Sequence, residues 1–114
     1  MQNIKKAILN YIKTHEGTSY VEIEDLFNKL GFEWEGDYCQ CSEKCSNVIY
    51  WTGWNKEAIQ ILNALQEEKT IHKVPTEPLI YLIDGKSINL PLVKSFKQYK
   101  QPHWLPVAFN CLGE

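Results

Sequence analysis

The spacing of apolar side chains predicts two helices at the start of the chain. Ile4, Ile8 and Ile12 recur every four residues and form one apolar stripe, which is typical of a helix packed on one side. Ser19 and Glu22 have the spacing of a capping box, which indicates the start of a second helix. The apolar face of this second helix comprises Ile23, Leu26, Phe27 and Leu30.

A third helix and a β-hairpin are predicted further along. Asn55 is a suitable N-cap, and the helix that follows has an apolar face made of Ala58, Ile61, Leu62 and Leu65. Residues 70–74 are then expected to be extended, the sequence PTEP to form a turn, and residues 79–83 to return as the second strand. The Asp84-Gly85 pair would close this hairpin.

The second and third helices are separated by an insertion, residues 32–54, which is rich in aromatic, acidic and cysteine residues. Its β-branched and aromatic stretch at 48–51 predicts a short strand, and the rest is expected to be an irregular loop. Five aromatic residues, Trp34, Tyr38, Tyr50, Trp51 and Trp54, crowd this insertion. Such side chains anchor protein interfaces well, although two or three of them are expected to belong to the core.

The charge distribution divides the chain at residue 85. Residues 1–85 carry eight lysines and thirteen acids, a charge of 8 minus 13, or -5, whereas residues 86–114 carry four lysines and one acid, 4 minus 1, or +3. Three prolines in this tail make a long helix unfavourable, so an extended segment packed on the body is expected. The predicted contacts of the tail are Leu90, Leu92, Val93, Trp104, Leu105, Val107 and Phe109.

Composition limits the classes of function. The chain has 114 residues, of which 44% are apolar, and a net charge of -2, so it is a globular composition without the broad positive field of a nucleic-acid coat. All twelve basic residues are lysines, and arginine is the residue that reads guanine edges best. The first fifteen residues predict neither a signal peptide nor a membrane span, so a cytoplasmic protein is expected.

The succession ILNYIKTHEGTSYVEIEDLFNKLGF, NKEAIQILNALQEEKTIHKV and PLIYLID resembles the winged helix-turn-helix superfamily over residues 3–84. The resemblance implies an α+β winged helix, three helices plus a β-hairpin wing, over residues 1–85 with the insertion at 32–54. The basic and aromatic segment 86–114 would pack on the same domain. The phrases WTGW and PHWLPV also resemble small proteins of phages and other mobile elements of AT-rich bacteria, a group that carries over no activity.

Two surfaces are candidates for nucleic acid. The exposed side of the third helix would present Lys56, Gln60 and Asn63, and amide side chains in a groove can read adenine. Lys94, Lys97 and Lys100 in the tail recur every third residue among aromatic residues, a pattern that suits a polynucleotide. Both patterns have other interpretations. The helix face is acidic enough to be simply solvated, and the tail could dock on the acidic body or on an acidic protein partner.

Cys39, Cys41 and Cys45 form a C-x-C-x3-C cluster. Three thiolates so close in sequence can bind zinc when a fourth ligand completes a tetrahedron. The strong zinc patterns carry two C-x2-C pairs, which this sequence lacks, so free thiols are the main alternative.

No motif in the sequence predicts catalysis, because the three histidines are scattered and no phosphate-binding or nucleophile motif occurs. We therefore expect a non-enzymatic protein without a cofactor that acts by binding a protein partner, as an accessory or host-modulating protein of a phage-like element. Its predicted contact residues are Trp34, Tyr38, Trp51, Trp54, Lys56, Gln60 and Asn63. The alternatives are a sequence-specific DNA-binding regulator and a small zinc-binding domain, and a homodimer is possible in each case.

Overall fold

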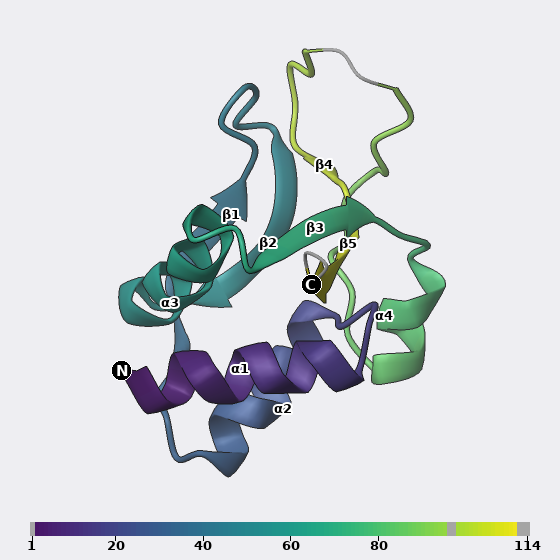
Figure 1. Cartoon of the computed structure of the whole chain (residues 1–114). Helices are drawn as coiled ribbons and strands as arrows, with labels where there is room; N and C mark the ends of the chain where they lie inside the picture. Colours follow the sequence, from purple (N-terminus) through teal and green to yellow (C-terminus); the bar gives the residue numbers. More distant parts are fainter. Residues whose placement is uncertain (1, 96–97, 112–114) are drawn as a thin grey trace.

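The computed structural model describes residues 2–95 and 98–111, which form an α+β fold (Figure 1). The elements within these residues are α1 (Gln2–Thr14), α2 (Tyr20–Lys29), β1 (Glu35–Cys41), β2 (Val48–Trp54), α3 (Lys56–Glu67), β3 (Ile71–Pro75), α4 (Leu79–Asp84), β4 (His103–Trp104) and β5 (Val107–Cys111).

The three predicted helices are confirmed, and their caps explain where they begin. The Ser19 side chain accepts a hydrogen bond from the Glu22 backbone N–H at 3.1 Å, and the Glu22 side chain accepts one from the Ser19 N–H at 3.1 Å. This reciprocal pair satisfies two N–H groups at the start of α2 that no helical carbonyl can reach. α3 has a simpler cap, in which the Asn55 side-chain oxygen accepts one hydrogen bond from the Ala58 N–H at 2.8 Å.

The predicted hairpin wing over residues 70–83 is wrong in its second strand. Residues 71–75 form β3 as expected, but Leu79–Asp84 is the helix α4. A segment in which nearly every residue is apolar has no readable period, and here the flanking residues decide the structure. Pro78 precedes the helix, and Gly85 adopts the left-handed conformation, with φ of 90°, that ends many helices.

The partner of β3 is instead β5, from the end of the chain. The two strands are antiparallel, with His72 opposite Asn110 and Val74 opposite Ala108. Thr18 forms an isolated antiparallel bridge to Phe109 on the other side of β5. The tail segment 86–114 therefore does more than cover the body, because Phe109 is fully buried in the core.

The insertion at 32–54 is largely a β-hairpin, which the sequence predicted only in part. The predicted strand at 48–51 lies within β2, but β1 was expected to be irregular loop. β1 pairs antiparallel with β2, and β4 joins the other edge of β2 in parallel. Gly36 is required where the hairpin passes the start of α3, since a Cβ there would lie 2.6 Å from the Asn55 Cα.

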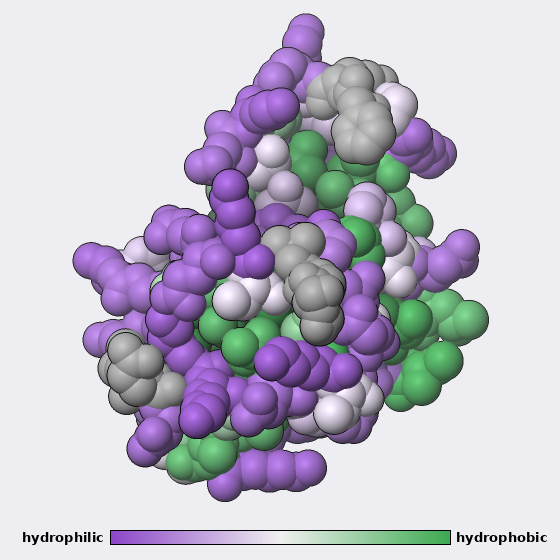
Figure 2. All heavy atoms as spheres, viewed as in Figure 1, coloured by the Kyte–Doolittle hydropathy of each residue, from purple (hydrophilic) through white to green (hydrophobic). Residues whose placement is uncertain are grey.

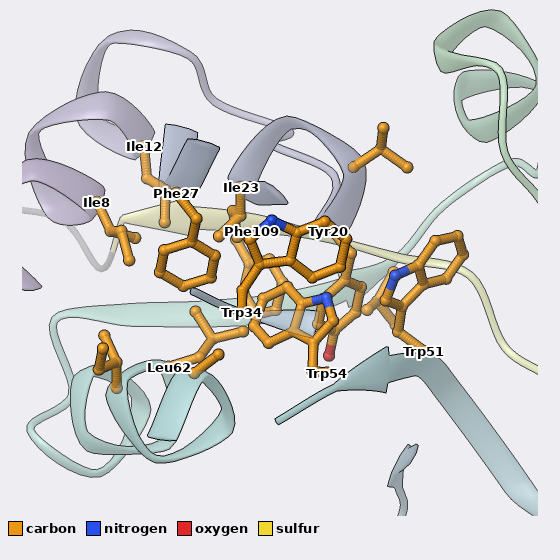
Figure 3. Packing of buried hydrophobic residues seen from close by; sticks show 14 of the residues in the cluster. Ile8, Ile12, Tyr20, Ile23, Phe27, Trp34, Trp51, Trp54, Leu62 and Phe109 are labelled. Atoms are coloured by element: carbon orange, nitrogen blue, oxygen red, sulfur yellow. The ribbon is translucent and has the colours of Figure 1, made fainter. Parts of the chain in front are cut away.

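Aromatic side chains from distant segments fill the core (Figure 3). The Tyr20 ring stacks on the Trp51 ring with centroids 5.9 Å apart, and it meets the Trp54 and Phe109 rings edge-on at 5.5 and 5.1 Å. These contacts join α2, the β1–β2 hairpin and β5. They also hold Trp51 and Trp54, whose indole N–H groups donate to the Glu24 carboxylate of α2.

Candidate functional site

Three of the four aromatic residues predicted to contact a partner are buried. Trp34, Trp51 and Trp54 have at most 9% of their surface exposed, so they are removed from the predicted partner surface and belong to the core (Figure 3). Tyr38, in β1, is 57% exposed. The physical reason is that β2 presents Trp51 and Trp54 towards α2, where a charged partner for both indoles lies.

That charged partner is Glu24, on the inner face of α2. Its side chain is only 3% exposed. Its Oε2 atom accepts hydrogen bonds from the Trp51 Nε1 at 2.7 Å and the Trp54 Nε1 at 2.9 Å. A buried carboxylate is tolerated only when hydrogen bonds or an opposite charge replace its lost hydration. The two indole N–H groups supply part of that replacement.

Lys86 supplies the opposite charge. Its Nζ lies 2.5 Å from the Glu24 Oε1 and 5.0 Å from the centroid of the Trp34 ring. The position of Lys86 is set by the end of α4, because its backbone N–H donates to the Tyr81 carbonyl at 3.1 Å. We call Glu24, Trp34, Trp51, Trp54 and Lys86 the Glu24 cluster.

The sequence interpretation missed Glu24 and Lys86 as site residues, although Glu24 carries a readable signal. Tyr20, Ile23, Glu24 and Phe27 follow the i, i+3, i+4, i+7 spacing of one buried helix face. An acid in such a stripe, followed later in the chain by several tryptophans, indicates a buried carboxylate that needs donors. For Lys86 no comparable signal exists, because its place depends on a helix that the sequence did not predict.

The candidate DNA-reading residues come from two separate segments of the chain, α3 and the loop that leads to β4. Lys56, Gln60 and Asn63 are exposed on α3. Lys94 and Lys100 are also exposed, in the loop that leads to β4. In Figure 1 this loop rises above the β3–β5 sheet. Its Gln98 side chain binds the Lys44 carbonyl, and Lys44 lines a cavity together with Asn63 of α3. Lys97 lies outside the described residues.

The loop that carries these lysines rests on the tip of the β1–β2 hairpin. The Asn47 Nδ2 donates to the Tyr99 carbonyl at 2.8 Å, and the Gln98 Nε2 donates to the Lys44 carbonyl at 3.0 Å. The Tyr99 ring lies against His103 with centroids 4.1 Å apart. Part of the aromatic and polar content of the tail is therefore used within the molecule.

The three clustered cysteines lie on β1 and the following turn. Cys39 is exposed, whereas Cys41 and Cys45 are half-buried. Burial, together with the neighbouring Cys39 and Cys45, raises the pKa of the Cys41 thiol, which makes its metal-binding thiolate form less available. Over residues 2–95 and 98–111, no three His, Cys, Asp or Glu side chains are placed so that they could hold a metal ion.

Next to Cys41 lies a cavity of about 540 Å³ that contains a half-buried lysine. Lys73, from β3, places its Nζ 4.0 Å from the centroid of the Tyr50 ring. Burial lowers the pKa of Lys73, against the opposing effect of Glu43. Asn63 of α3 lines the same cavity, so one predicted contact residue borders a concave surface.

Among the described residues, the outer face of α4 carries three of the six exposed large apolar side chains. Leu79, Leu82 and Ile83 are 58%, 60% and 75% exposed, and their i, i+3, i+4 spacing places them on one side of the helix. Figure 2 shows the resulting hydrophobic patch projecting at the position of α4. We call these three residues the α4 patch.

The opposite side of α4 is firmly attached to the body. The Tyr81 hydroxyl donates to the Val107 carbonyl at 2.6 Å and accepts from the Tyr20 N–H at 3.2 Å. The Asp84 carboxylate accepts from the Ser19 hydroxyl at 2.8 Å. The α4 patch therefore faces outwards from a helix whose inner side is held by two buried hydrogen bonds and one partly buried hydrogen bond.

Comparison with known proteins gives no relative from which a role could be transferred. No family model, no curated protein and no solved structure matches the chain. Among the described helices, none has the length and apolar character needed to cross a membrane.

Proposed function

We propose that the protein is a non-enzymatic protein-interaction module, and that the α4 patch is the surface that contacts its partner. The single observation that carries the proposal is the exposure of three large apolar side chains on one face of a short, anchored helix. Large apolar side chains grouped on a surface are unusual and mark interaction sites more often than isolated ones. The role as an accessory or host-modulating protein of a phage-like element rests on the sequence resemblance alone.

The attachment of α4 to the body supports a role for its outer face in binding, because the helix is already held in place. Tyr81 and Asp84 tie the inner side of α4 to β5 and to the start of α2. A partner that covers Leu79, Leu82 and Ile83 would therefore order little of the protein on binding. Pre-ordered apolar side chains lose less conformational entropy on association than mobile ones.

A winged-helix core is also proposed, with β5 in the place that the sequence interpretation gave to residues 79–83. The order α1, the Thr18 bridge, α2, α3 and β3 keeps the succession on which the resemblance was based as far as residue 75, and β5 would supply the second strand from outside residues 3–84. In this proposal residues 76–106, which include α4 and β4, replace the short wing turn. The α4 patch would then sit within an enlarged wing.

The proposal is tested by comparing two surface variants of equal charge change. Leu82→Asp with Ile83→Asp introduces two acids into the α4 patch, and Gln60→Asp with Asn63→Asp introduces two on the exposed side of α3. Proteins captured from a lysate of the natural host by the wild type should be lost with the α4 variant and retained with the α3 variant. Equal capture by all three proteins would remove the α4 patch as the contact surface.

The same proteins separate the alternative functions. Anisotropy with labelled duplex DNA at low and moderate salt should give flat curves, whereas a DNA-binding regulator would bind with a steep dependence on salt. Sedimentation of the wild type and the α4 variant distinguishes a homodimer, because a dimer through the α4 patch would dissociate in the variant. A monomer in both cases leaves a different protein as the partner.

A further inference from the structure

The Glu24 cluster opens into a cavity of about 570 Å³. The cavity lies between α2, the start of β1, the end of β2 and the irregular segment after α4. The residues that matter for its chemistry are Glu24, Trp34, Glu35, Trp51, Lys86 and Ile88. It thus combines a buried acid, Glu24, an exposed acid, Glu35, two aromatic surfaces and a single lysine.

The two oxygens of Glu24 have different roles. Both indole N–H groups bind Oε2, whereas Lys86 binds Oε1. The Lys86 ammonium also lies over the face of Trp34, and an aromatic face attracts a cation. The cavity therefore already holds an alkylammonium group, recognised by a charge-assisted hydrogen bond and a ring face.

This ammonium group is attached in a way that allows it to leave. The Lys86 side chain is 48% exposed, although its carboxylate partner is almost fully buried. The backbone of Lys86 is held by its bond to the Tyr81 carbonyl, so rotation of the flexible side chain does not require α4 to move. Lysine carries a compact charge on a flexible stem, and a second ammonium could take its place on Oε1.

We propose that the cavity is a binding site for a primary alkylammonium group, and that Lys86 is an intramolecular occupant which the ligand displaces. A primary ammonium fits better than a quaternary one, because Oε1 needs an N–H donor. The group could belong to a free amine or to a lysine side chain of another protein. This inference does not depend on the α4 patch.

The test is a titration with n-butylammonium, followed by the indole N–H resonances of Trp51 and Trp54 in nitrogen-15 NMR spectra. The wild type should show a saturable shift, and Lys86→Ala should bind at least about tenfold more tightly because no internal group competes. Lys86→Gln keeps the length of the side chain without its charge and should behave similarly, which covers the case that the alanine variant does not fold. In Glu24→Gln the saturable shift should be lost.

n-Butanol, which has the same alkyl chain without the charge, serves as the control ligand. The proposal is overturned if n-butanol shifts the indole resonances as much as n-butylammonium does in the Lys86 variants. It is also overturned if the wild type shows no saturable shift up to about 100 mM amine, a concentration that would reveal even a very weak site. In that case the Lys86 ammonium group stays bound to Glu24 and the cavity does not bind a ligand.

A second arm distinguishes the two sources of the ammonium group. 1,5-Diaminopentane represents a free amine, and a short peptide with one central lysine represents a protein. Tighter binding of the peptide would assign the site to a protein lysine, and tighter binding of the diamine would assign it to a small molecule. Either result supports the site itself. Loss of partner capture by the α4 variant is measured separately, so failure of one proposal leaves the other intact.

Discussion

The Glu24 cluster contains a charged side chain in an apolar environment, whereas the α4 patch exposes apolar side chains to water. Glu24 is an acid buried beneath tryptophans, whereas Leu79, Leu82 and Ile83 are large apolar residues exposed to water. A buried polar group and an exposed apolar group are the informative exceptions in a folded protein. The two regions nevertheless differ in how their unusual environment is compensated.

The lost hydration of Glu24 is replaced by groups of the chain itself, whereas nothing in the described part of the chain covers the apolar side chains of the α4 patch. Two indole donors and one ammonium satisfy the carboxylate within the chain itself. The three apolar residues of α4 remain in water in the isolated protein. Glu24 therefore contributes to the stability of the fold, in addition to the ammonium binding proposed for it, whereas the α4 patch is available to a protein partner. Substitutions in the two regions should therefore separate stability from association.

Glu24→Ala should have the largest effect on stability. The substitution leaves two buried indole N–H groups without an acceptor, and removing one partner from a buried charged network costs about 3–5 kcal/mol. Glu24→Gln keeps the shape and one carbonyl oxygen, so it should cost less. Urea unfolding followed by circular dichroism measures both variants. A loss below about 1 kcal/mol in the alanine variant would mean that the carboxylate is not the structural centre of the core.

Trp51→Phe and Trp54→Phe should each cost about 2–3 kcal/mol, through a lost hydrogen bond and lost core volume. Both indoles donate to the same Glu24 oxygen. The double variant should therefore cost more than the sum, because only then is that oxygen left without a donor. Such coupling is what a double-mutant cycle detects. When the same double-mutant cycle is repeated in the Glu24→Ala background, the coupling energy between the two tryptophans should vanish.

Tyr81→Phe should cost about 1–2 kcal/mol, because it leaves the Val107 carbonyl and the Tyr20 N–H buried without their partner. Relative to the wild type, amide hydrogen exchange in this variant should also accelerate more in α4 than in α1. Tyr81 lies on the inner side of the helix that carries the α4 patch, so this variant tests whether the patch depends on a firm anchor. Unchanged exchange in α4 would assign the anchoring to Asp84 and Lys86 instead.

The parts of the fold that the sequence predicted are those encoded locally. Ser19, Glu22 and Asn55 specify the starts of α2 and α3 within one helical turn, and such signals do not depend on the rest of the molecule. The strand β1 was missed because its sequence EGDYCQC has few apolar residues, and its burial pattern is almost entirely exposed. Its pairing with β2, together with the close approach at Gly36, determines its structure.

The wrong assignment of residues 79–83 has a non-local cause as well. The pairing of β3 was decided by β5, more than thirty residues further along the chain, and no local pattern specifies which distant strand is chosen. Pro78 and Gly85 were readable as helix boundaries, but Asp84-Gly85 was interpreted as the end of a hairpin. The α4 patch and the position of Lys86 could therefore not be predicted, since both depend on that helix.

Ile83→Ser should change the free energy of unfolding by less than about 0.5 kcal/mol, as expected for an exposed position. The matched control is Ile23→Ser on the buried face of α2, which should cost several kcal/mol by burying a hydroxyl and leaving a cavity. Urea unfolding of the two variants makes the contrast between exposed and buried isoleucines quantitative. A substantial loss in Ile83→Ser would mean that the α4 patch packs on the protein itself and is not available to a partner.

Lys73→Met should have the smallest effect, visible only in the pH dependence of stability. Burial lowers the pKa of Lys73 from its ordinary value of 10.5, so the folded protein holds this proton less tightly than the unfolded chain does. The unfolded state therefore binds more protons between the two pKa values, and stability due to Lys73 rises with pH in that interval.

The methionine variant lacks this contribution but keeps an apolar stem against the Tyr50 ring. The difference in stability between wild type and Lys73→Met should therefore shift in favour of the wild type as the pH rises towards 10.5, the ordinary pKa of lysine. Both proteins are compared in a Cys41→Ser background, because the Cys41 thiol and Lys73 influence each other's pKa. Unlike Glu24, Lys73 would then be a charge whose burial is only partly compensated. A difference in stability that stays constant with pH would mean that the buried charge of Lys73 is fully compensated, as that of Glu24 is.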